Sequence, residues 1–370
     1  MAVAEDLKIQ VMMVGGRRCG KTSVLAAMKR NFDELFNSKN LVIRYGDTET
    51  LDALEDKNAE IEEYFWSAGG RTFTPDSNPT DEMMQYAFKV GIPGKRGSIK
   101  IDFIDYPGEW LTDKIHIKDL KACVEKTQVI IIAIDTPHMM EEAGRFNEQR
   151  NGCNRVEGML KMALEDAPEM RRLVLFVPLK CECYLADGRM NEVLEKTKES
   201  YDEIINYFGQ LKSIYEVAVT PIFTLGGAMF SHFETDKLTG EIKINEKFRT
   251  PEKPIYYFPD VNVKKPEPKY CEQPIQFGEN LMDYSETMTA DDVITALIPL
   301  GAAIEQETDE NASEFERLEK NVDITSVNDG KDYIYSKEAV ENFGWVWRTE
   351  KWDDVSVPAN LLKKATEFLT

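Results

Sequence analysis

Histidine is scarce in this chain, and its cysteines are not gathered into a recognisable pattern. Only three of the 370 residues are histidine, and neither H-E-x-x-H nor a paired Cys/His spacing is present. These absences exclude the common sequence patterns of zinc sites. The six cysteines form no dense framework, which excludes a small secreted fold held together by disulfides.

Positive charge is also in deficit, because 45 Lys and Arg stand against 66 Asp and Glu, giving a net charge of −21. Nonspecific binding to nucleic acid or to an anionic membrane needs cationic patches, so we expect neither partner. Apolar runs such as VIIIAI are far shorter than the roughly 20 residues of a membrane-spanning helix. The polar start MAVAEDLKIQ is unlike a secretory signal, so we expect a cytoplasmic protein.

Over its first 228 residues the chain alternates apolar runs with stretches of helical period. Runs such as VIIIAID and LVLFVP have no polar alternation, which is typical of strands buried on both faces. The alternation predicts an α/β domain with a mostly parallel sheet flanked by helices. The expected strands are Leu7–Val14, Met84–Val90, Ser98–Asp105, Gln128–Asp135, Arg172–Pro178 and Tyr215–Thr224, and the clearest expected helices are Lys114–Lys126 and Arg189–Lys212.

The character of the sequence changes after Gly227. Residues 229–280 are polar and carry six prolines, and residues 279–370 hold 21 acidic but only 8 basic side chains. We therefore divide the chain into a domain of residues 1–228 and a smaller appended α+β region of residues 229–370 that packs on or is coupled to it. An aromatic set near the end has two interpretations, a strand packed on a core, which its alternating spacing favours, or a partner surface; it consists of Phe343, Trp345, Trp347 and Trp352.

The strongest motif is GGRRCGKT at residues 15–22, which satisfies G-x-x-x-x-G-K-[ST] between a predicted strand and a predicted helix. Its glycines let backbone N–H groups surround phosphates at the positive end of the helix dipole. Lys21 would reach the β- and γ-phosphates, Thr22 would ligate Mg²⁺, and Cys19 is expected to be a small neutral filler. The predicted nucleotide-binding residues of this loop are Gly15, Gly16, Arg17, Arg18, Cys19, Gly20, Lys21, Thr22 and Ser23.

A second motif, IDFIDYPGEW, supplies the partner groups that a phosphate loop needs. Asp105 ends an apolar strand and can hold Mg²⁺ through water, and the N–H of Gly108 can sense a γ-phosphate. Glu109 follows, where a water-positioning glutamine is usual. A nucleotide switch also needs a loop that contacts Mg²⁺ only in the triphosphate state. The polar stretch before the strand offers Thr72, Thr74 and Thr80, of which we favour Thr80 as the metal ligand.

Base recognition is expected in the loop after LVLFVP. Guanine is usually read by an N/T-K-x-D segment, and this chain has Leu179, Lys180, Cys181 and Glu182 there. Lys180 can pack its stem on the base, and the Glu182 carboxylate can accept from guanine N1–H and its amino group, whereas Leu179 cannot replace the usual amide. The loop after the next strand brings the backbone of Leu225 and Gly226 near the base.

GGRRCGKT, DYPGEW, PLKCE and TPIFTLGG occur in an order that resembles the YcjX-like and double-GTPase branch of TRAFAC-class P-loop GTPases, over residues 7–228. The resemblance implies GTP binding with Mg²⁺, slow hydrolysis and a switch role. We expect the partner of that switch to be a protein effector or a second G domain. Members are found in bacteria, some in gene neighbourhoods associated with stress or conflict with phage. Leu179 and Glu182 differ from the usual N/T-K-x-D segment, and this difference bears on the selectivity for guanine, not on nucleotide binding itself.

Two other functions remain open at the level of sequence: an ATP-dependent enzyme such as a phosphotransferase, and a scaffold that binds nucleotide without hydrolysis. The scaffold is considered because an ionised Glu109 can accept a hydrogen bond from water but cannot donate one to phosphate. Catalysis would rest on Lys21, Gly108, Glu109 and Arg18. Guanylate-binding proteins carry an arginine at the place of Arg18 that serves as a finger in cis, and Arg17 is its nearest rival.

Overall fold

The computed structural model describes the phosphate-loop region, most of the predicted domain and part of the chain after it. Thr80, Phe343, Trp345, Trp352 and most of the predicted appended region lie outside the described residues. The described ranges are 7–38, 42–68, 72–75, 82–91, 99–111, 115–165, 172–210, 215–260, 265–269, 271 and 347–348.

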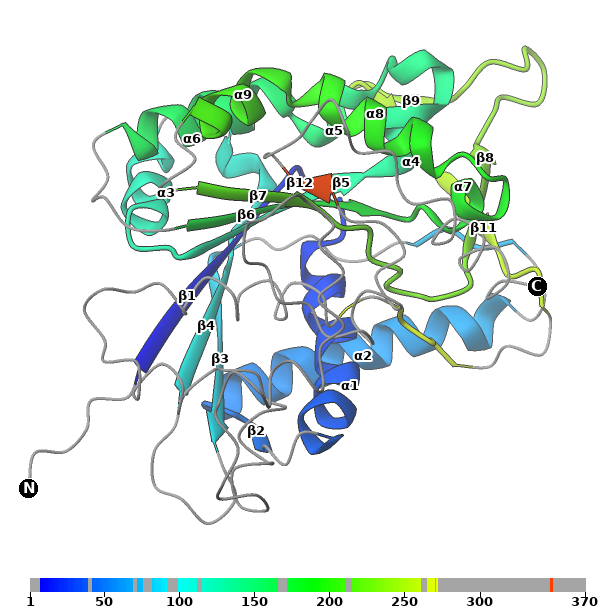
Figure 1. Cartoon of the computed structure of the whole chain (residues 1–370). Helices are drawn as coiled ribbons and strands as arrows, with labels where there is room; N and C mark the ends of the chain where they lie inside the picture. The colour runs from blue at the N-terminus through cyan, green and yellow to red at the C-terminus, as the bar shows by residue number, and fades with distance from the viewer. Residues whose placement is uncertain are drawn as a thin grey trace, which may run out of the picture.

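An eight-stranded sheet forms the middle layer of this part of the chain (Figure 1). Its five central strands are parallel, while β2 and β3 on one side and β12 on the other pair antiparallel with their neighbours. In sheet order the strands are β12 (Trp347–Arg348), β7 (Tyr215–Val219), β6 (Arg172–Leu179), β5 (Val129–Asp135), β1 (Leu7–Val14), β4 (Ile99–Asp105), β3 (Met84–Gly91) and β2 (Val42–Tyr45).

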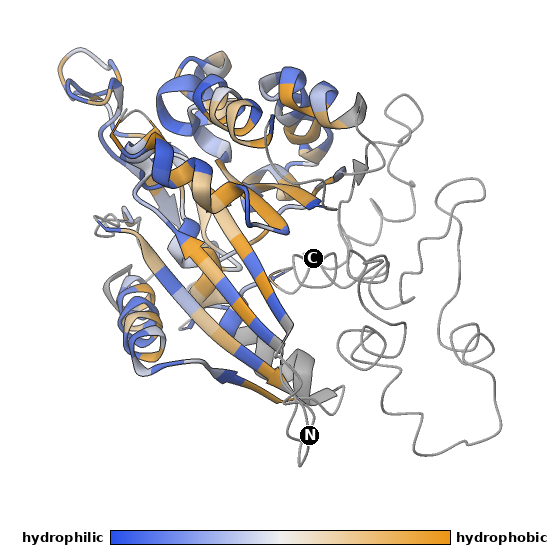
Figure 2. Cartoon of the chain, turned by 90° about the vertical axis from the view of Figure 1, so that its left-hand side faces the viewer, coloured by the Kyte–Doolittle hydropathy of each residue, from blue (hydrophilic) through white to orange (hydrophobic). Residues whose placement is uncertain are grey.

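Helices cover both faces of the sheet, as Figure 1 shows. Every residue of β5 is buried, and the two apolar clusters on either side of the sheet explain why its sequence is apolar without alternation. Figure 2 shows long hydrophobic stretches, in orange, along the strands of the sheet. One face carries α1 (Lys21–Ser38) and α2 (Thr48–Ala68). The other carries α3 (Ile117–Val124), α4 (Thr136–Met140), α5 (Asn147–Asn151), α6 (Cys153–Leu164), α7 (Glu182–Ala186), α8 (Met190–Ser200) and α9 (Asp202–Gln210).

The predicted fold class is confirmed: the sheet is mostly parallel and flanked by helices. The first strand has its predicted bounds, and four others agree to within one residue at each end. The last predicted strand was too long, because β7 ends at Val219 and Pro221 has no N–H to continue the ladder. The single helix predicted over Arg189–Lys212 was also wrong. It is α8 and α9, interrupted at Tyr201, whose buried ring packs 5.1 Å from that of Phe176.

The chain after residue 228 returns to the sheet domain. Strand β8 (Met229–Phe233) pairs antiparallel with β11 (Pro254–Tyr257), and a short pair of β9 (Ile244–Asn245) and β10 (Thr250–Pro251) lies between them in sequence. Phe73 forms two backbone hydrogen bonds of 2.8 Å with Tyr256, so the segment before β3 joins this second sheet. Aromatic residues after 228 share one core with α2 and β3. The division of the chain after residue 228 stays a prediction.

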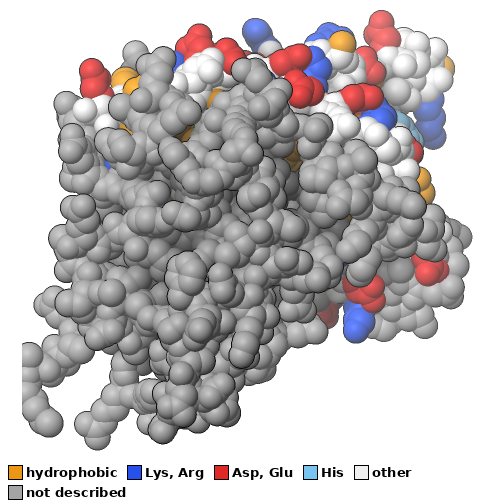
Figure 3. Space-filling view, viewed as in Figure 1, with side chains coloured by type: hydrophobic (Ala, Val, Ile, Leu, Met, Phe, Trp, Pro, Cys, Tyr) orange, Lys and Arg blue, Asp and Glu red, His pale blue; other side chains and the backbone are white. Residues whose placement is uncertain are grey.

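The described surface carries charges of both signs, which gather over the helices at the top of Figure 3. Within the described ranges, no helix combines the length and apolar character that crossing a bilayer requires.

Because residues after 228 pack in the same core as α2, we expect the two parts of the chain to unfold together. The buried ring of Phe258 lies 4.4 Å from Phe65 of α2 and 4.9 Å from Phe73. Phe258→Ala should lower the free energy of unfolding by about 3–5 kcal/mol while leaving one cooperative transition in urea. Leu238→Ala, at a side chain that is 96% exposed, is the control and should leave stability unchanged. Two transitions, of which only one shifts, would show instead that the chain after residue 228 has a core of its own.

Candidate functional site

The turn between β1 and α1 is the predicted phosphate loop, and its backbone explains its residues. Gly20 has φ of +116°, which residues with a side chain rarely adopt. At Gly16 a Cβ would lie 1.8 Å from the carbonyl oxygen of Arg150, so no side chain fits there. Cys19 is fully buried, and burial raises the pKa of its thiol, so it is a neutral filler of the loop. The loop is thus shaped by close backbone packing against α5.

Lys21, Thr22 and Asp105 meet where the adjacent parallel strands β1 and β4 end. The Thr22 hydroxyl donates to Asp105 Oδ2 at 2.6 Å, and Lys21 Nζ lies 3.3 Å from the Gly15 carbonyl and 3.7 Å from Asp105 Oδ1. Lys21 and Asp105 are buried, and Oδ1 of Asp105 accepts no hydrogen bond from the described residues. Asp105 therefore contacts both the loop lysine and Thr22, the other predicted metal ligand.

This donor set fits Mg²⁺. A hydroxyl and a buried carboxylate oxygen without a hydrogen-bond donor are hard oxygen ligands, and Mg²⁺ commonly takes only one or two protein ligands beside phosphate and water. Among the described residues there is no cluster of three or more His, Cys, Asp or Glu that would form an all-protein cage. Thr22 and Asp105 would hold the ion together with phosphate oxygens.

The D-x-x-G segment lies against the phosphate loop. At Gly108 a Cβ would lie 2.3 Å from the backbone nitrogen of Arg17, so only glycine permits this contact. The next residue, Glu109, places Oε1 2.8 Å from Nε of Arg17. The predicted γ-phosphate sensor thus sits beside the loop that would carry the phosphate.

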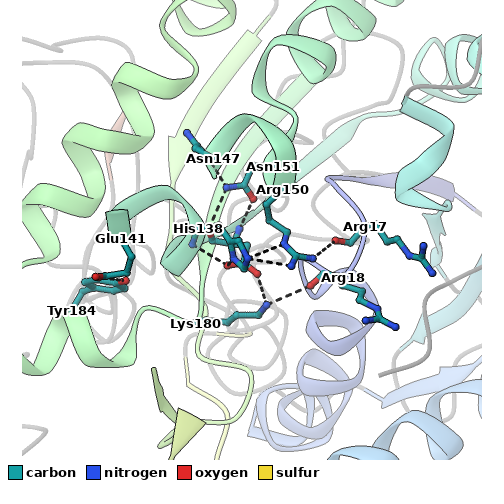
Figure 4. Close-up of polar contacts among 10 residues, drawn as sticks. Arg17, Arg18, His138, Glu141, Asn147, Arg150, Asn151, Lys180 and Tyr184 are labelled. Atoms are coloured by element: carbon teal, nitrogen blue, oxygen red, sulfur yellow. Dashed lines mark hydrogen bonds and ion pairs between the residues drawn. The ribbon is translucent and has the colours of Figure 1, made fainter. Parts of the chain in front are cut away.

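A buried network that the sequence analysis did not identify ties the base-side loop to the phosphate loop (Figure 4). Asp135, the last residue of β5, is fully buried and accepts from Lys180 Nζ at 2.5 Å and from His138 Nδ1 at 2.6 Å. Lys180 also reaches the carbonyl oxygen of Arg18 at 3.4 Å. These contacts take the place of the missing amide at Leu179: an ion pair, not an amide side chain, fixes the loop after β6.

Arg150 completes the network from α5. Its guanidinium donates to His138 Nε2 at 3.2 Å and, through Nη1, to the carbonyl oxygen of Arg17 at 3.2 Å. In Figure 4 the side chains of Arg17 and Arg18 point away from this cluster, while their carbonyl oxygens face it. Asn151 adds hydrogen bonds to both the N–H and the C=O of Asp135. The sequence held one signal of this network: Asp135 ends a buried apolar strand, as Asp105 does.

The network fixes the protonation state of His138. Arginine can only donate, so the Nε2 that faces Arg150 must accept, and the proton lies on Nδ1 toward Asp135. Burial and the nearby Arg150 charge lower the pKa of His138, although Asp135 opposes them. Burial alone would raise the pKa of Asp135, but the donors of His138 and Lys180, with the charge of Arg150, hold it well below its usual range. The pair is therefore a neutral imidazole on an ionised carboxylate.

A cavity of about 220 Å³ opens beside the loop, on the side of Lys180 and Glu182. It collects several predicted residues from distant parts of the sequence, together with a roof from the chain after residue 228 that was not predicted. The predicted residues are Arg18, Cys19, Gly20, Ser23, Thr74, Lys180, Glu182 and Leu225; the roof is Glu252, Lys253, Pro254 and Tyr256. Thr72 is exposed, and neither it nor Gly226 lines the cavity.

Glu182 is the buried acid of this cavity. It is 6% exposed, and its Oε2 has no hydrogen-bond partner among the described residues. Burial raises its pKa to about 8, against the smaller opposing effects of its own backbone N–H and of Lys180 and Lys269. A buried carboxyl with an open oxygen is suited to a ligand that brings its own donors.

The sequence model of the Double-GTPase 2 family matches residues 9–231, which include the phosphate loop, the D-x-x-G segment and the base-side loops. The chain belongs to the Double-GTPase 2 family. No curated protein matches it in sequence.

Among solved structures, this Double-GTPase 2 chain is similar to the GTPase-like domain of Ski7 from S. cerevisiae bound to GTP. That match has 13% identity, a TM-score of 0.36, and covers 66% of this chain and 48% of that chain. The same domain bound to GDP and inorganic phosphate is 12% identical, with a TM-score of 0.31 and coverage of 58% and 43%. The chain spans less than half the length of these two structures.

The neutral state of His138 can be tested by pH titration. With only three histidines in the chain, NMR should show one imidazole that titrates well below the ordinary value of about 6.5. His138→Gln should remove that signal and thereby assign it. Because the folded pKa is lowered, the unfolded chain binds more protons below about pH 6.5, so stability should fall as the pH drops through this range. A His138 that is charged at pH 6.5 would contradict the hydrogen-bond assignment.

Proposed function

We propose that this protein is a Mg²⁺-dependent GTP-binding protein that hydrolyses GTP slowly and acts as a nucleotide-state switch for a partner. One observation carries the proposal: the phosphate-loop lysine meets the two candidate Mg²⁺ ligands at the same loop whose Gly20 and Ser23 line the cavity of Lys180 and the buried Glu182. The partner is a protein effector or a second G domain. From the resemblance in sequence, we place the switch in the bacterial cytoplasm, in a response to stress or phage.

At the phosphate end, Lys21 exchanges its contact with Gly15 for the β- and γ-phosphates, and Gly108 N–H faces the γ-phosphate. Thr22, Asp105 and, in the triphosphate state, Thr80 would hold Mg²⁺, which would neutralise negative charge on the phosphates. The helix dipole of α1 adds to the positive potential at this point. All of these groups favour a nucleoside triphosphate with its metal.

At the base end, the stem of Lys180 packs on the ring while its ammonium stays on Asp135. The open Oε2 of Glu182 can accept from N1–H and the amino group of guanine. Backbone groups of Leu225 and Gly226 lie in the neighbouring loop. Hydrolysis is slow because Glu109 cannot donate to the phosphate when ionised. An Arg18 side chain that reached the phosphates would stabilise part of the negative charge of the transition state of hydrolysis.

ATP is a second candidate ligand, and the raised pKa of Glu182 favours it. A protonated carboxyl presents one donor and one acceptor, which matches the amino group and ring nitrogen of adenine. An ionised carboxylate presents acceptors alone, which matches the two donors of guanine. Guanine must therefore release the proton of Glu182, and adenine need not.

Lys21→Ala tests the phosphate site. The variant removes the cation that faces the β- and γ-phosphates, so tight GTP binding should be lost in isothermal titration calorimetry. Circular dichroism should stay unchanged, and Lys161→Ala, at a surface lysine paired with Glu203, should bind GTP like the parent. A folded Lys21→Ala protein that keeps the parent affinity would refute the assignment of the loop.

Glu182→Gln tests base recognition and its proton. The parent should prefer GTP to ATP, and its GTP affinity should rise with pH up to about 8 because binding releases the Glu182 proton. The variant cannot ionise, so its GTP/ATP ratio should be narrower and its GTP affinity independent of pH in this range. Equal GTP and ATP affinities in the parent, with no pH dependence, would support the ATP candidate instead.

A further inference from the structure

One charged side chain of the phosphate loop lies outside the cavity and joins three segments. The Arg17 Nε is 2.8 Å from Glu109 Oε1, and its guanidinium carbon lies 4.8 Å from the centre of the Phe248 ring. Glu109 follows β4, and Phe248 lies in the turn between β9 and β10. Arg17 is therefore the point where the phosphate loop, the D-x-x-G segment and the chain after residue 228 meet.

The place of Arg17 is next to the expected γ-phosphate. The residue before Glu109 is Gly108, whose Cα faces the backbone nitrogen of Arg17 so closely that a Cβ would lie 2.3 Å from it. Gly108 N–H is the group proposed to sense the γ-phosphate. The Arg17 side chain would consequently start beside a bound γ-phosphate, and it is only 26% exposed, so its charge is partly removed from water.

The contact between Arg17 Nε and Glu109 is an ion pair without a directed hydrogen bond. Although Glu109 Oε1 lies 2.8 Å away, the buried Nε makes no directed hydrogen bond in the described part of the chain. A guanidinium binds best when its planar N–H groups point at the acceptor oxygens. A terminal phosphoryl group offers three oxygens and more negative charge than one half-exposed carboxylate, and it matches the planar fork of arginine.

We propose that Arg17 distinguishes a nucleoside triphosphate from a diphosphate by exchanging Glu109 for the γ-phosphate. This rests on the proposed nucleotide function. Glu109 is then a competitor that holds Arg17 when the γ-phosphate is absent. It is not a group that positions water.

The exchange also reaches beyond the phosphate loop. Phe248 stacks on the same guanidinium, and Asn245 fixes the turn by accepting from the N–H groups of Lys247 and Phe248, each at 3.1 Å. Movement of Arg17 toward phosphate removes the cation from one face of the ring. The turn of residues 245–249 thereby registers whether the γ-phosphate is present.

The test compares affinities for a non-hydrolysable GTP analogue and for GDP. In Arg17→Ala the ratio of analogue to GDP affinity should fall about tenfold or more, the effect expected for a charge-assisted contact, while GDP affinity stays the same. In Glu109→Ala the ratio should rise, because the competitor is gone. In the Arg17→Ala background, Glu109→Ala should leave the ratio unchanged. Lys247→Ala removes the second cation, 5.0 Å from the same ring, and should leave both affinities unchanged.

A ratio that is unchanged in Arg17→Ala, in a protein that still binds both nucleotides, would overturn this inference and leave the proposed function intact. Slower GTP hydrolysis in Glu109→Ala without a change in the ratio would also overturn it, because Glu109 would then act on water. If Arg17→Ala does not fold, Glu109→Ala alone decides, and an unchanged ratio counts against the exchange. A parent that binds neither nucleotide refutes the proposed function itself.

Discussion

The buried carboxylate of Asp135 holds the site together. It receives Lys180 from the loop after β6 and His138 from α4, while Asn151 of α5 binds its backbone. A buried charge is stable only when its partners satisfy it, so these segments cannot move independently without leaving the carboxylate unpaired. Because Arg150 also donates to the Arg17 carbonyl, one hydrogen-bond network joins the base side and the phosphate side of the site.

Parallel strand ends explain why residues far apart in sequence act together. Asp105 ends β4 and Thr22 lies in the helix that follows the neighbouring β1, so the two meet at the carboxyl ends of these strands although 83 positions separate them. Asp135 and Lys180 stand in the same relation at the ends of β5 and β6. Ligand sites at the carboxyl ends of such strands are a general property of open α/β sheets.

The sequence predicted these strand ends well because buried parallel strands are apolar without alternation and the phosphate-loop motif has fixed spacing. It did not predict the roles of His138 and Arg150, since α4 and α5 have five residues each and show no helical period. The break between α8 and α9 at Tyr201 was missed because the apolar residues of α9 continue the apolar stripe of α8. The contact between Arg17 and Phe248 depends on tertiary packing between segments more than 200 residues apart, which no local pattern encodes.

The roof of the cavity has a consequence for how this protein is made. Glu252, Lys253, Pro254 and Tyr256 close the base side, but the phosphate loop is synthesised more than 200 residues earlier. On the ribosome strands β1 to β7 of the sheet can form while the cavity is still open, and Phe73 has no strand to pair with until Tyr256 emerges. A nascent chain, or a fragment cut after residue 228, exposes the aromatic surface of Tyr64, Phe65 and Phe73 to water. A fragment made for expression must therefore extend past Phe258 to keep this aromatic core covered.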